Sequence, residues 1–396
     1  MPASSFQLPA VGLTESRNSE TQKLKTQSSQ LEAGSWKLEA EDWKLTLKIA
    51  VIAGDGIGRE VIPAGISVLE KAISASGARL EFVEFPWGCD FYRRTGHMMD
   101  PDGLDRLRDF DAIYLGAIGD PAVPDHVSVW ELILPIRQRF DQYINLRPMR
   151  LLPGIKGPLA GPSAADIDMI CVRENSEGEY VGFGGRLHPG TAQEVAEQTS
   201  VFTRRGVERV ARFAFELALR RPRRRLASAT KSNAMQHTMV LWDEAVGAVA
   251  ADYPGVEWRK YHVDALAARM VTDPASLDVI VASNLFGDIL TDLGAAVSGS
   301  LGVAPGANLN PERQFPSMFE PIHGSAPDIA GSGIANPIGA IWAGALMLDH
   351  LGLTGAHDLI VSAIEQVLQE EGARTPDLGG RARTTDVTRA VLGRLP

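Results

Sequence analysis

Cysteine, positive charge and long apolar runs are all scarce in this sequence. Only two cysteines, Cys89 and Cys171, occur in 396 residues, far apart and without metal-ligand spacing. We therefore expect two small buried thiols in a reducing, cytoplasmic compartment, and we exclude a disulfide scaffold. The longest apolar run, residues 338–348, is too short to span a membrane and predicts a buried helix. The net charge of −10 disfavours a nucleic-acid partner.

The one basic run, residues 220–225, does not change that exclusion. It follows a segment in which Val207, Val210 and Leu217 recur at helical spacing. Cations at a helix C-terminus interact favourably with the helix dipole, and Pro222 then prevents the helix from continuing. The run therefore fits the end of a helix.

Residues 1–44 differ from the rest of the chain. They are polar, contain no apolar core and lack the basic start of a secretory signal. Their acids, such as Glu15 and Glu20, also argue against a transit peptide. We expect a disordered extension and leave it out of the predicted fold.

Strand-like and helix-like segments alternate from Leu47 to Ser283, which predicts an α/β architecture with covered sheets. The length of 396 residues suggests about two or three domains. The first strand ends in a glycine-rich turn whose glycines stand at positions 54, 56 and 58. Arg59 occupies the place where a dinucleotide-binding fingerprint needs its last glycine. We expect a tight turn near a ligand, and not a Rossmann phosphate site.

Two carboxylates lie four residues apart in NLFGDILTD, directly after an apolar strand-like run. On the predicted helix Asp288 and Asp292 share one face, where two like charges are destabilising. A hard divalent cation with oxygen ligands would compensate them. An arbitrary pair of this kind is more often two solvated acids, so the metal hypothesis depends on further groups, among them Asp264.

Other residues suggest binding of a carboxylate and transfer of a proton. Guanidinium groups bind carboxylates bidentately, so Arg137, Arg147 and Arg173 suggest a substrate with at least one carboxylate. Tyr180 and Lys231 are plausible proton-transfer groups near a metal. Taken singly, each has an ordinary alternative as a surface charge, a buried hydroxyl or a salt-bridge partner.

Five motifs together resemble the β-decarboxylating dehydrogenases, the family of isocitrate and isopropylmalate dehydrogenases. They are GDGIGREV, INLRP, RENSEGEY, NLFGDILTD and EPIHGSAPDIAGSGIANP, and the resemblance extends from about Leu47 to the C-terminus. It implies an isopropylmalate-dehydrogenase-like, non-Rossmann α/β fold of two domains. Residues 45–142 plus 300–396 would form the larger, cofactor-side domain. Residues 143–299 would form a smaller central domain that also dimerises.

The resemblance implies roles in substrate and metal binding. The substrate-binding residues would be Arg137, Arg147, Arg173 and Asn233. The ligands of Mg²⁺ or Mn²⁺ would be Asp264, Asp288 and Asp292. Asp264 would come from the neighbouring subunit, so the resemblance implies a homodimer with shared active sites. K⁺ is a further candidate cofactor.

Two residues would transfer protons in such a site. Lys231, also from the partner subunit, would help to remove the proton of the substrate hydroxyl as hydride leaves. Tyr180 would protonate the enolate that remains after CO₂ departs, while the metal stabilises that enolate as a Lewis acid.

The resemblance also implies NAD as the cofactor. The residues that would contact it are His323, Gly324, Ser325, Ala326, Asp328, Ile329 and Asn336. Asp328 would accept hydrogen bonds from both hydroxyls of the adenosine ribose and would repel the 2′-phosphate of NADP. Asp328 also has a purely structural interpretation as a helix N-cap after Pro327.

Features around Arg137 favour one branch of the family. Trp130 in VSVWELILPIRQ, with FDQYINLRP, VFTRRGVERV and TKSNAM, resembles the branch that acts on D-malate and tartrate. We therefore expect NAD-dependent oxidative decarboxylation of a malate-type 2-hydroxy acid, either D-malate to pyruvate and CO₂ or the oxidation of tartrate.

Three alternatives stay open. 3-Isopropylmalate is one, because Glu131, Ile133 and Leu134 loosely match the hydrophobic wall expected for an isopropyl group. Isocitrate or homoisocitrate is another. A non-catalytic regulatory paralogue is the third, and the retained Lys231 and Tyr180 argue against it.

Overall fold

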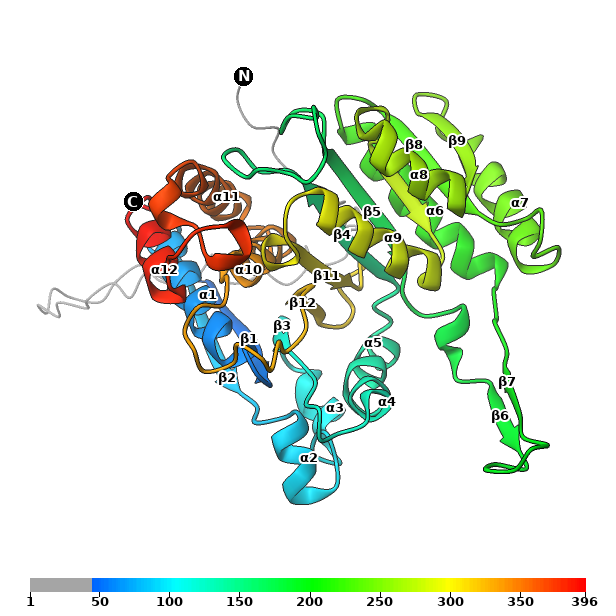
Figure 1. The fold of residues 1–396 in the computed structure, drawn as a ribbon, viewed down its shortest axis with the longest axis horizontal. Helices are drawn as coiled ribbons and strands as arrows, with labels where there is room; N and C mark the ends of the chain where they lie inside the picture. The colour runs from blue at the N-terminus through cyan, green and yellow to red at the C-terminus, as the bar shows by residue number, and fades with distance from the viewer. Residues whose placement is uncertain (1–44) are drawn as a thin grey trace, which may run out of the picture.

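The computed structural model describes residues 45–396. The extension predicted for residues 1–44 lies outside the described residues. The described chain forms an α/β structure of three layers around one ten-stranded sheet (Figure 1). The predicted α/β class is confirmed.

The strands cross the sheet in an order that brings distant segments of the chain together. From one edge to the other they are β2 (Ala78–Glu84), β1 (Leu45–Gly54), β3 (Ala112–Ala117), β12 (Ser317–Pro321), β11 (Pro305–Leu309), β4 (Ile144–Arg150), β5 (Asp168–Glu174), β10 (Val279–Ala282), β8 (Arg225–Thr230) and β9 (Glu257–His262). The outer pairs are parallel, whereas β12, β11, β4 and β5 pair antiparallel. This order is not that of a Rossmann sheet.

Helices cover both faces of the sheet. One face carries α1 (Gly58–Ile73), α6 (Arg204–Arg220), α7 (Thr238–Ala250), α10 (Ile338–His350), α11 (Thr354–Leu368) and α12 (Thr384–Leu392). The other face carries α2 (Cys89–Thr95), α3 (Gly103–Leu107), α4 (Asp125–Ser128), α5 (Leu134–Arg139), α8 (Val263–Thr272) and α9 (Asn284–Val297). The central strands β3 and β10 are buried along their whole length, which explains why their sequences are almost continuously apolar.

Short turns complete the described chain. The 3₁₀ turns are η2 (Glu179–Val181), η3 (Pro274–Ser276), η4 (Leu301–Val303), η5 (Glu371–Ala373) and η6 (Pro376–Leu378), and η1 (Val129–Ile133) is one π-helical turn. The segment that leads to Arg137 is divided into α4, η1 and α5.

The sheet divides by origin into two halves. The first and last parts of the chain supply β1 to β3, β11 and β12, and the middle of the chain supplies the other five strands. The halves meet where β11 pairs with β4, with Ala307 opposite Leu146. The sheet is continuous across this junction, so the domain boundaries at residues 142 and 300 stay a prediction.

Several local predictions are confirmed. Every residue of α10 is buried, and the predicted stripe of α6 faces the core. Helix α6 ends at Arg220, where the basic run begins. Cys89 and Cys171 are buried free thiols.

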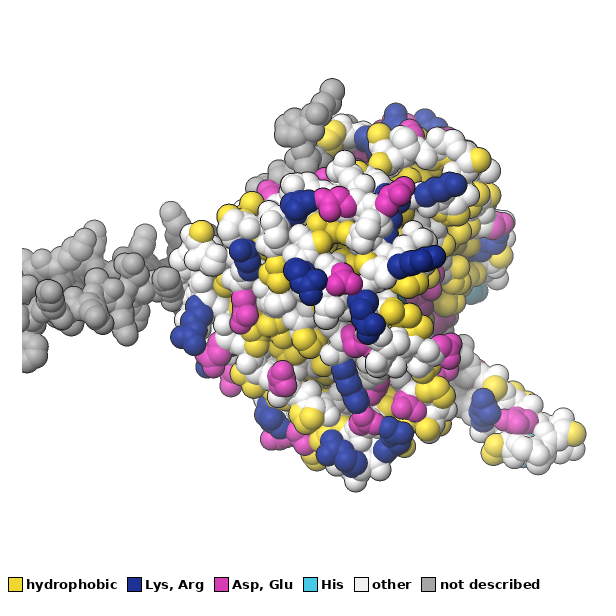
Figure 2. Space-filling view, turned by 60° about the vertical axis from the view of Figure 1, so that its left-hand side comes forward, with side chains coloured by type: hydrophobic (Ala, Val, Ile, Leu, Met, Phe, Trp, Pro, Cys, Tyr) yellow, Lys and Arg dark blue, Asp and Glu magenta, His cyan; other side chains and the backbone are white. Residues whose placement is uncertain are grey.

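The surface agrees with the scarcity of long apolar runs and of positive charge in the sequence. No helix within residues 45–396 is long and apolar enough to cross a membrane. On the face drawn in Figure 2, acidic and basic side chains are interspersed and do not form a single basic field.

A two-stranded hairpin extends from the body of the molecule (Figure 1). Its strands, β6 (Gly184–Leu187) and β7 (Val195–Gln198), form a separate sheet, and their residues are exposed. Phe183, at its base, is 61% exposed and Leu187 is 65% exposed. An isolated hairpin is at best marginally stable in water, so this one is suited to contact with another surface.

Candidate active site

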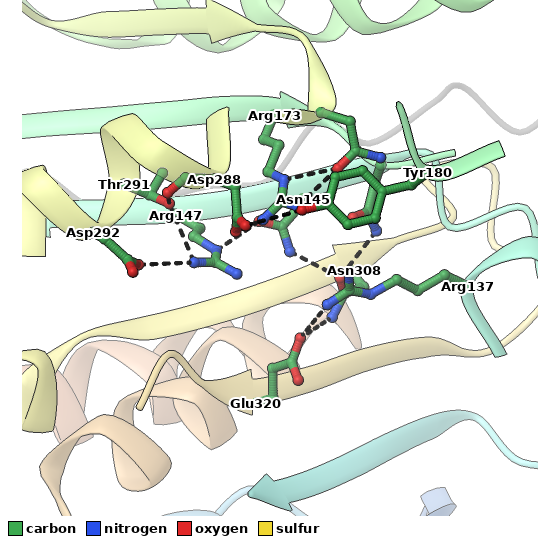
Figure 3. A network of polar contacts seen from close by, with 12 residues as sticks. Arg137, Asn145, Arg147, Arg173, Tyr180, Asp288, Thr291, Asp292, Asn308 and Glu320 are labelled. Atoms are coloured by element: carbon green, nitrogen blue, oxygen red, sulfur yellow. Dashed lines mark hydrogen bonds and ion pairs between the residues drawn. The ribbon is translucent and has the colours of Figure 1, made fainter. Parts of the chain in front are cut away.

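Three buried arginines converge between the sheet and its covering helices (Figure 3). Arg147 lies on β4, Arg173 lies on the adjacent β5, and Arg137 reaches the same place from α5. All three are less than 9% exposed. Buried guanidinium groups are costly unless anions compensate them, so the anions around them define the site.

Two aspartates on α9 supply part of this compensation. Arg173 forms an ion pair and a hydrogen bond with Asp288. Arg147 Nη1 lies 3.8 Å from Asp292 Oδ1. The two acids share one face of the helix, as their spacing predicts, and α9 packs on β4 and β5 so that this face meets the arginines.

The first turn of α9 is shaped around Arg173. Asn284 Oδ1 accepts hydrogen bonds from Nη2 of Arg173 at 2.8 Å and from Nε at 3.1 Å. A Cβ atom at Gly287 would lie 2.5 Å from Cγ of Arg173, so a larger residue would push the helix away. The segment NLFGD therefore contacts the Arg173 side chain along its length and places Asp288 beside the guanidinium group.

Tyr180 joins this group from η2, just after β5. Its hydroxyl donates a hydrogen bond to Asp288 Oδ2 at 3.2 Å, and Arg173 lies over its ring, with the guanidinium carbon 5.6 Å from the ring centroid. Burial raises the pKa of Tyr180, and the negative charge of Asp288 raises it further. The hydroxyl is therefore protonated at neutral pH.

Arg147 and Asp288 keep their charges. Burial lowers the pKa of Arg147 to about 10, with Arg173 contributing, which still leaves it charged at neutral pH. Burial alone would raise the pKa of Asp288, but Arg173 and Arg147 outweigh that effect, so its net shift is downward. The site thus combines fixed cations, an ionised carboxylate and a neutral phenol.

A chain of buried polar groups links Arg147 to Arg137. Nε of Arg147 donates to Asn145 Oδ1 at 2.7 Å, and Nδ2 of Asn145 donates to Asn308 Oδ1 at 2.8 Å. Nδ2 of Asn308 donates to Glu320 Oε1 at 2.7 Å, and Nη2 of Arg137 donates to the same oxygen at 2.9 Å. Asn145 stands two residues before Arg147, so strand alternation could have placed them on one face. The sequence carries no comparable signal for Asn308 and Glu320.

Arg137 retains an unused donor. Its Nε–H is buried and has no hydrogen-bond acceptor within residues 45–396. Burial lowers the pKa of Arg137, and Glu320 opposes this shift. Because buried donors are normally satisfied, a ligand acceptor would remove an unfavourable feature here.

Lys231 and Asp264 form an ion pair of their own, with Nζ 2.8 Å from Oδ2. Lys231 follows β8, Asp264 lies in the first turn of α8, and Asn233 is exposed in the turn after Lys231. The hydrogen bond from Lys231 lowers the pKa of Asp264. In the described part of the chain, no three His, Cys, Asp or Glu side chains gather as potential metal ligands. Within one chain, Asp264 therefore does not join the acids of α9.

The loop predicted to bind the cofactor packs against the glycine-rich turn after β1. The Ile57 N–H donates to the Ser325 carbonyl at 2.9 Å, and the Gly331 N–H donates to Glu60 Oε1 at 2.6 Å. Nε2 of His323 is buried and has no partner among residues 45–396, and burial lowers the pKa of this histidine. Loop and turn together form one surface with a free hydrogen-bonding group.

The rest of the loop presents backbone and one carboxylate. Gly324 and Asp328 are exposed, Ser325 is buried and Ile329 is half-buried. Ala326 has a φ of +42°, which is uncommon for a residue with a side chain and marks a tightly bent loop.

The structural interpretation of Asp328 as a helix N-cap is wrong. The residues after it form a turn, and the next helix, α10, begins only at Ile338. Asn336 takes part in the start of that helix instead, since its Oδ1 accepts a hydrogen bond from the Ile338 N–H at 3.0 Å. Its Nδ2 donates to Asp377 Oδ2 at 3.0 Å, so both ends of this side chain are engaged within the chain.

Comparison with known proteins decides the family. Residues 48–391 match the family model described as isocitrate/isopropylmalate dehydrogenase. The chain belongs to the isocitrate/isopropylmalate dehydrogenase family. The family predicted from the five motifs is confirmed.

Relatives within the isocitrate/isopropylmalate dehydrogenase family match nearly their whole length. The chain is 55% identical to D-malate dehydrogenase (decarboxylating) of Escherichia coli (strain K12), over 87% of this chain and 98% of the relative. It is 52% identical to tartrate dehydrogenase/decarboxylase of Pseudomonas putida, over 87% and 97%. The crystal structure of isocitrate dehydrogenase from Methylococcus capsulatus has a TM-score of 0.80 at 34% identity and covers 88% of this chain and 99% of that chain. The predicted isopropylmalate-dehydrogenase-like fold is confirmed.

The substitution Glu320→Gln tests the charge compensation at Arg137. Glutamine can still accept hydrogen bonds from Arg137 and Asn308, but it removes the negative charge. We expect the free energy of unfolding to fall by about 1–3 kcal/mol, less than the roughly 3–5 kcal/mol of a fully broken buried pair. Denaturant unfolding measures this change.

Glu244→Gln is the matched control, because Glu244 pairs with Arg204 and both side chains are about half exposed. We expect that change to cost less than about 1 kcal/mol. Equal losses from the two substitutions would contradict the role of Glu320 as a buried counter-charge.

Proposed function

We propose that this protein is an NAD-dependent and divalent-metal-dependent dehydrogenase of malate-type 2-hydroxy acids, which oxidatively decarboxylates D-malate to pyruvate and CO₂, oxidises tartrate, or does both. The observation that carries this proposal is the convergence of Arg137, Arg147 and Arg173 on one buried place. Guanidinium groups bind carboxylates, and a malate-type acid carries two. The 55% and 52% identities to proteins named for D-malate and tartrate favour this substrate class.

The acids of α9 suit a hard divalent cation. Carboxylate oxygens are the ligands that Mg²⁺ and Mn²⁺ prefer, and Asp288 and Asp292 present them from one helical face. The Asp292 side chain is 63% exposed and so accessible to a cation. The partner subunit's Asp264 would be the third ligand. When bound, such a cation would act as a Lewis acid toward a substrate oxygen.

Binding and orientation of the substrate are assigned to the arginines. The unused Nε–H of Arg137 would donate to one carboxylate, and Arg147 and Arg173 would contribute charge from the sheet side. All three side chains are held by Asn145, Asn284 or Glu320, so little conformational entropy is lost when a substrate binds.

Proton transfer is assigned to two residues. The partner subunit's Lys231 would help to remove the proton of the 2-hydroxyl as C2 of the substrate loses its hydride. Loss of CO₂ from C3 of the resulting keto acid leaves an enolate, and Tyr180 would donate its proton to C3, the carbon that carried the lost carboxylate. One proton leaves and one returns, so malate and NAD⁺ become pyruvate, CO₂ and NADH.

The loop from His323 to Asn336 suits the binding of NAD, which would accept the hydride. The buried Nε2 of His323 lacks a protein partner among the described residues and offers one hydrogen bond. The exposed carboxylate of Asp328 would accept hydrogen bonds from the two hydroxyls of a ribose, and it would repel the extra phosphate of NADP.

A homodimer with shared active sites is part of the proposal. The Lys231–Asp264 pair belongs to a different cluster from Asp288 and Asp292, although the proposed reaction needs all four groups. The projecting hairpin, with exposed Phe183, offers a contact surface for a second subunit. A cytoplasmic location and a K⁺ requirement stay predictions from the sequence, as does the absence of a nucleic-acid or membrane partner.

The substrate proposal is tested by a parallel measurement of NADH production. D-malate, L-tartrate, meso-tartrate, 3-isopropylmalate and isocitrate are compared with Mn²⁺ present and again after its removal by a chelator. We expect the highest kcat/KM on D-malate or a tartrate and no turnover without a divalent cation. A preference for 3-isopropylmalate or isocitrate would overturn the substrate, and inactivity on all five would favour a regulatory paralogue.

The two proton-transfer residues should fail at different steps. Tyr180→Phe keeps the ring and deletes the hydroxyl, and we expect turnover to fall by roughly 10²-fold or more with little change in KM. Lys231→Met should slow hydride transfer itself, so substrate deuterated at the 2-carbon should show a larger isotope effect on kcat than in Tyr180→Phe. Small, equal effects in both variants would reduce these residues to structural groups.

Cofactor choice is tested at Asp328. We expect the wild type to have a higher kcat/KM with NAD than with NADP. Asp328→Lys should shift the ratio toward NADP, because it replaces a repulsive charge by an attractive one. Asp109→Lys, between α3 and β3, makes the same charge change at an exposed carboxylate outside the loop and serves as the control. A wild-type preference for NADP, or equal shifts in the two variants, would contradict the assignment.

A further inference from the structure

Tyr180 lies in a turn that is held by contacts with two different parts of the chain. The turn η2 is bounded by Gly178 and Gly182, whose φ angles of +77° and +79° are in the left-handed region. Glycine adopts this region without steric cost, which allows a sharp bend on each side of the tyrosine. The position of the Tyr180 hydroxyl therefore depends on contacts that hold the bends in place.

The start of this turn is held by its own neighbourhood in the chain. The Gly178 N–H donates to the Val201 carbonyl at 2.8 Å. The Gln198 side chain donates to the Glu179 carbonyl at 2.7 Å, and Ser200 Oγ donates to Glu179 Oε1 at 3.0 Å. Gln198 is the last residue of β7, and Ser200 and Val201 follow directly after this hairpin.

The end of the turn rests on Trp130, which belongs to η1 in a distant part of the chain. A Cβ atom placed on Gly182 would lie 2.9 Å from Cζ3 of Trp130 and 3.1 Å from Cη2, so the indole ring packs directly against this glycine. Trp130 is nevertheless 41% exposed. It also forms one wall of a cavity of about 490 Å³ against β6 and β7. A large apolar ring is thus kept at the surface against the turn that carries Tyr180.

The π turn explains how Trp130 comes to lie there. Pro135 has no N–H, and its ring would clash with the carbonyl of Glu131 in a regular helix. The chain widens instead, so that the Leu134 N–H donates to the Val129 carbonyl five residues back. Single π turns of this kind are frequent at functional sites. The widened segment presents Trp130 two turns before Arg137, which α5 carries into the arginine cluster.

We propose that Trp130 is a positioning residue that holds the Tyr180 turn, so that the phenol hydroxyl lies where it can deliver its proton. This inference rests on the proposed function, because it takes Tyr180 as the proton donor. The contact joins the segment that carries Arg137 to the turn that carries Tyr180. Substrate binding by Arg137 and the position of the proton donor Tyr180 therefore depend on the same contact.

The first test is kinetic. Trp130→Ala should lower kcat by about 10-fold or more with a smaller change in KM, since a misplacement of about 1 Å can cost roughly 100-fold. Trp130→Phe, which keeps an aromatic ring, should recover part of the loss. Leu359→Ala, which truncates a 42% exposed leucine on α11, is the control and should leave kcat unchanged. Equal kcat in Trp130→Ala and wild type would overturn the proposal.

A double-mutant cycle shows whether the effect passes through Tyr180. In the Tyr180→Phe background, Trp130→Ala should cost less than about 2-fold, because the group that Trp130 positions is already gone. Full additivity of the two losses would overturn the proposal and leave Trp130 with an independent role.

A second measurement needs no turnover. In Trp130→Ala, hydrogen exchange of the backbone amides in residues 178–182 should accelerate, and it should stay at the wild-type rate in Leu359→Ala. Unchanged exchange in Trp130→Ala would overturn the proposal even in an active enzyme. If the wild type turned over none of the five substrates but the exchange accelerated as expected, the proposed function would fail while the support of the turn by Trp130 would stand.

Discussion

Compensation of buried positive charge is the constraint on which the rest of the site depends. Three guanidinium groups lie almost out of water, and each meets an acid: Asp288 at Arg173, Asp292 near Arg147, and Glu320 at Arg137. Removing any one acid would leave a buried cation without its partner, which is among the costlier defects in a folded protein. The acids come from α9 and β12 and the arginines from β4, β5 and α5, so the site forms only when both halves of the sheet are joined.

This charge balance also shapes what the site can accept. With each arginine already matched by one acid, a dicarboxylate adds two negative charges, and a divalent cation would offset them. The unused donor of Arg137 and the protonated hydroxyl of Tyr180 then add directional contacts on top of the charge. Substrate and cation would therefore bind more favourably together than either would alone, which suits a reaction in which negative charge develops on a substrate oxygen.

The sequence predicted the features that depend on residues close together in the chain. Helical spacing placed Asp288 and Asp292 on one face, and the displaced glycine pattern that ends at Arg59 excluded a Rossmann turn. Contacts between distant segments were not visible: nothing near Glu320 indicates that Asn308 joins it to the arginines, because strand pairing across the sheet depends on the whole fold. The π turn before Pro135 was likewise not predicted from the sequence.

The central claim is that one chain holds the arginines and the acids of α9, while the other chain supplies Lys231. The direct measurement uses two differently tagged chains, one with Lys231→Met and one with Asp288→Asn, purified together as a heterodimer. Shared sites predict one intact site out of two, and so about half of the wild-type turnover per dimer, although each variant homodimer is nearly inactive. A heterodimer as inactive as the two homodimers would show that each site is built within a single chain, and it would contradict the account.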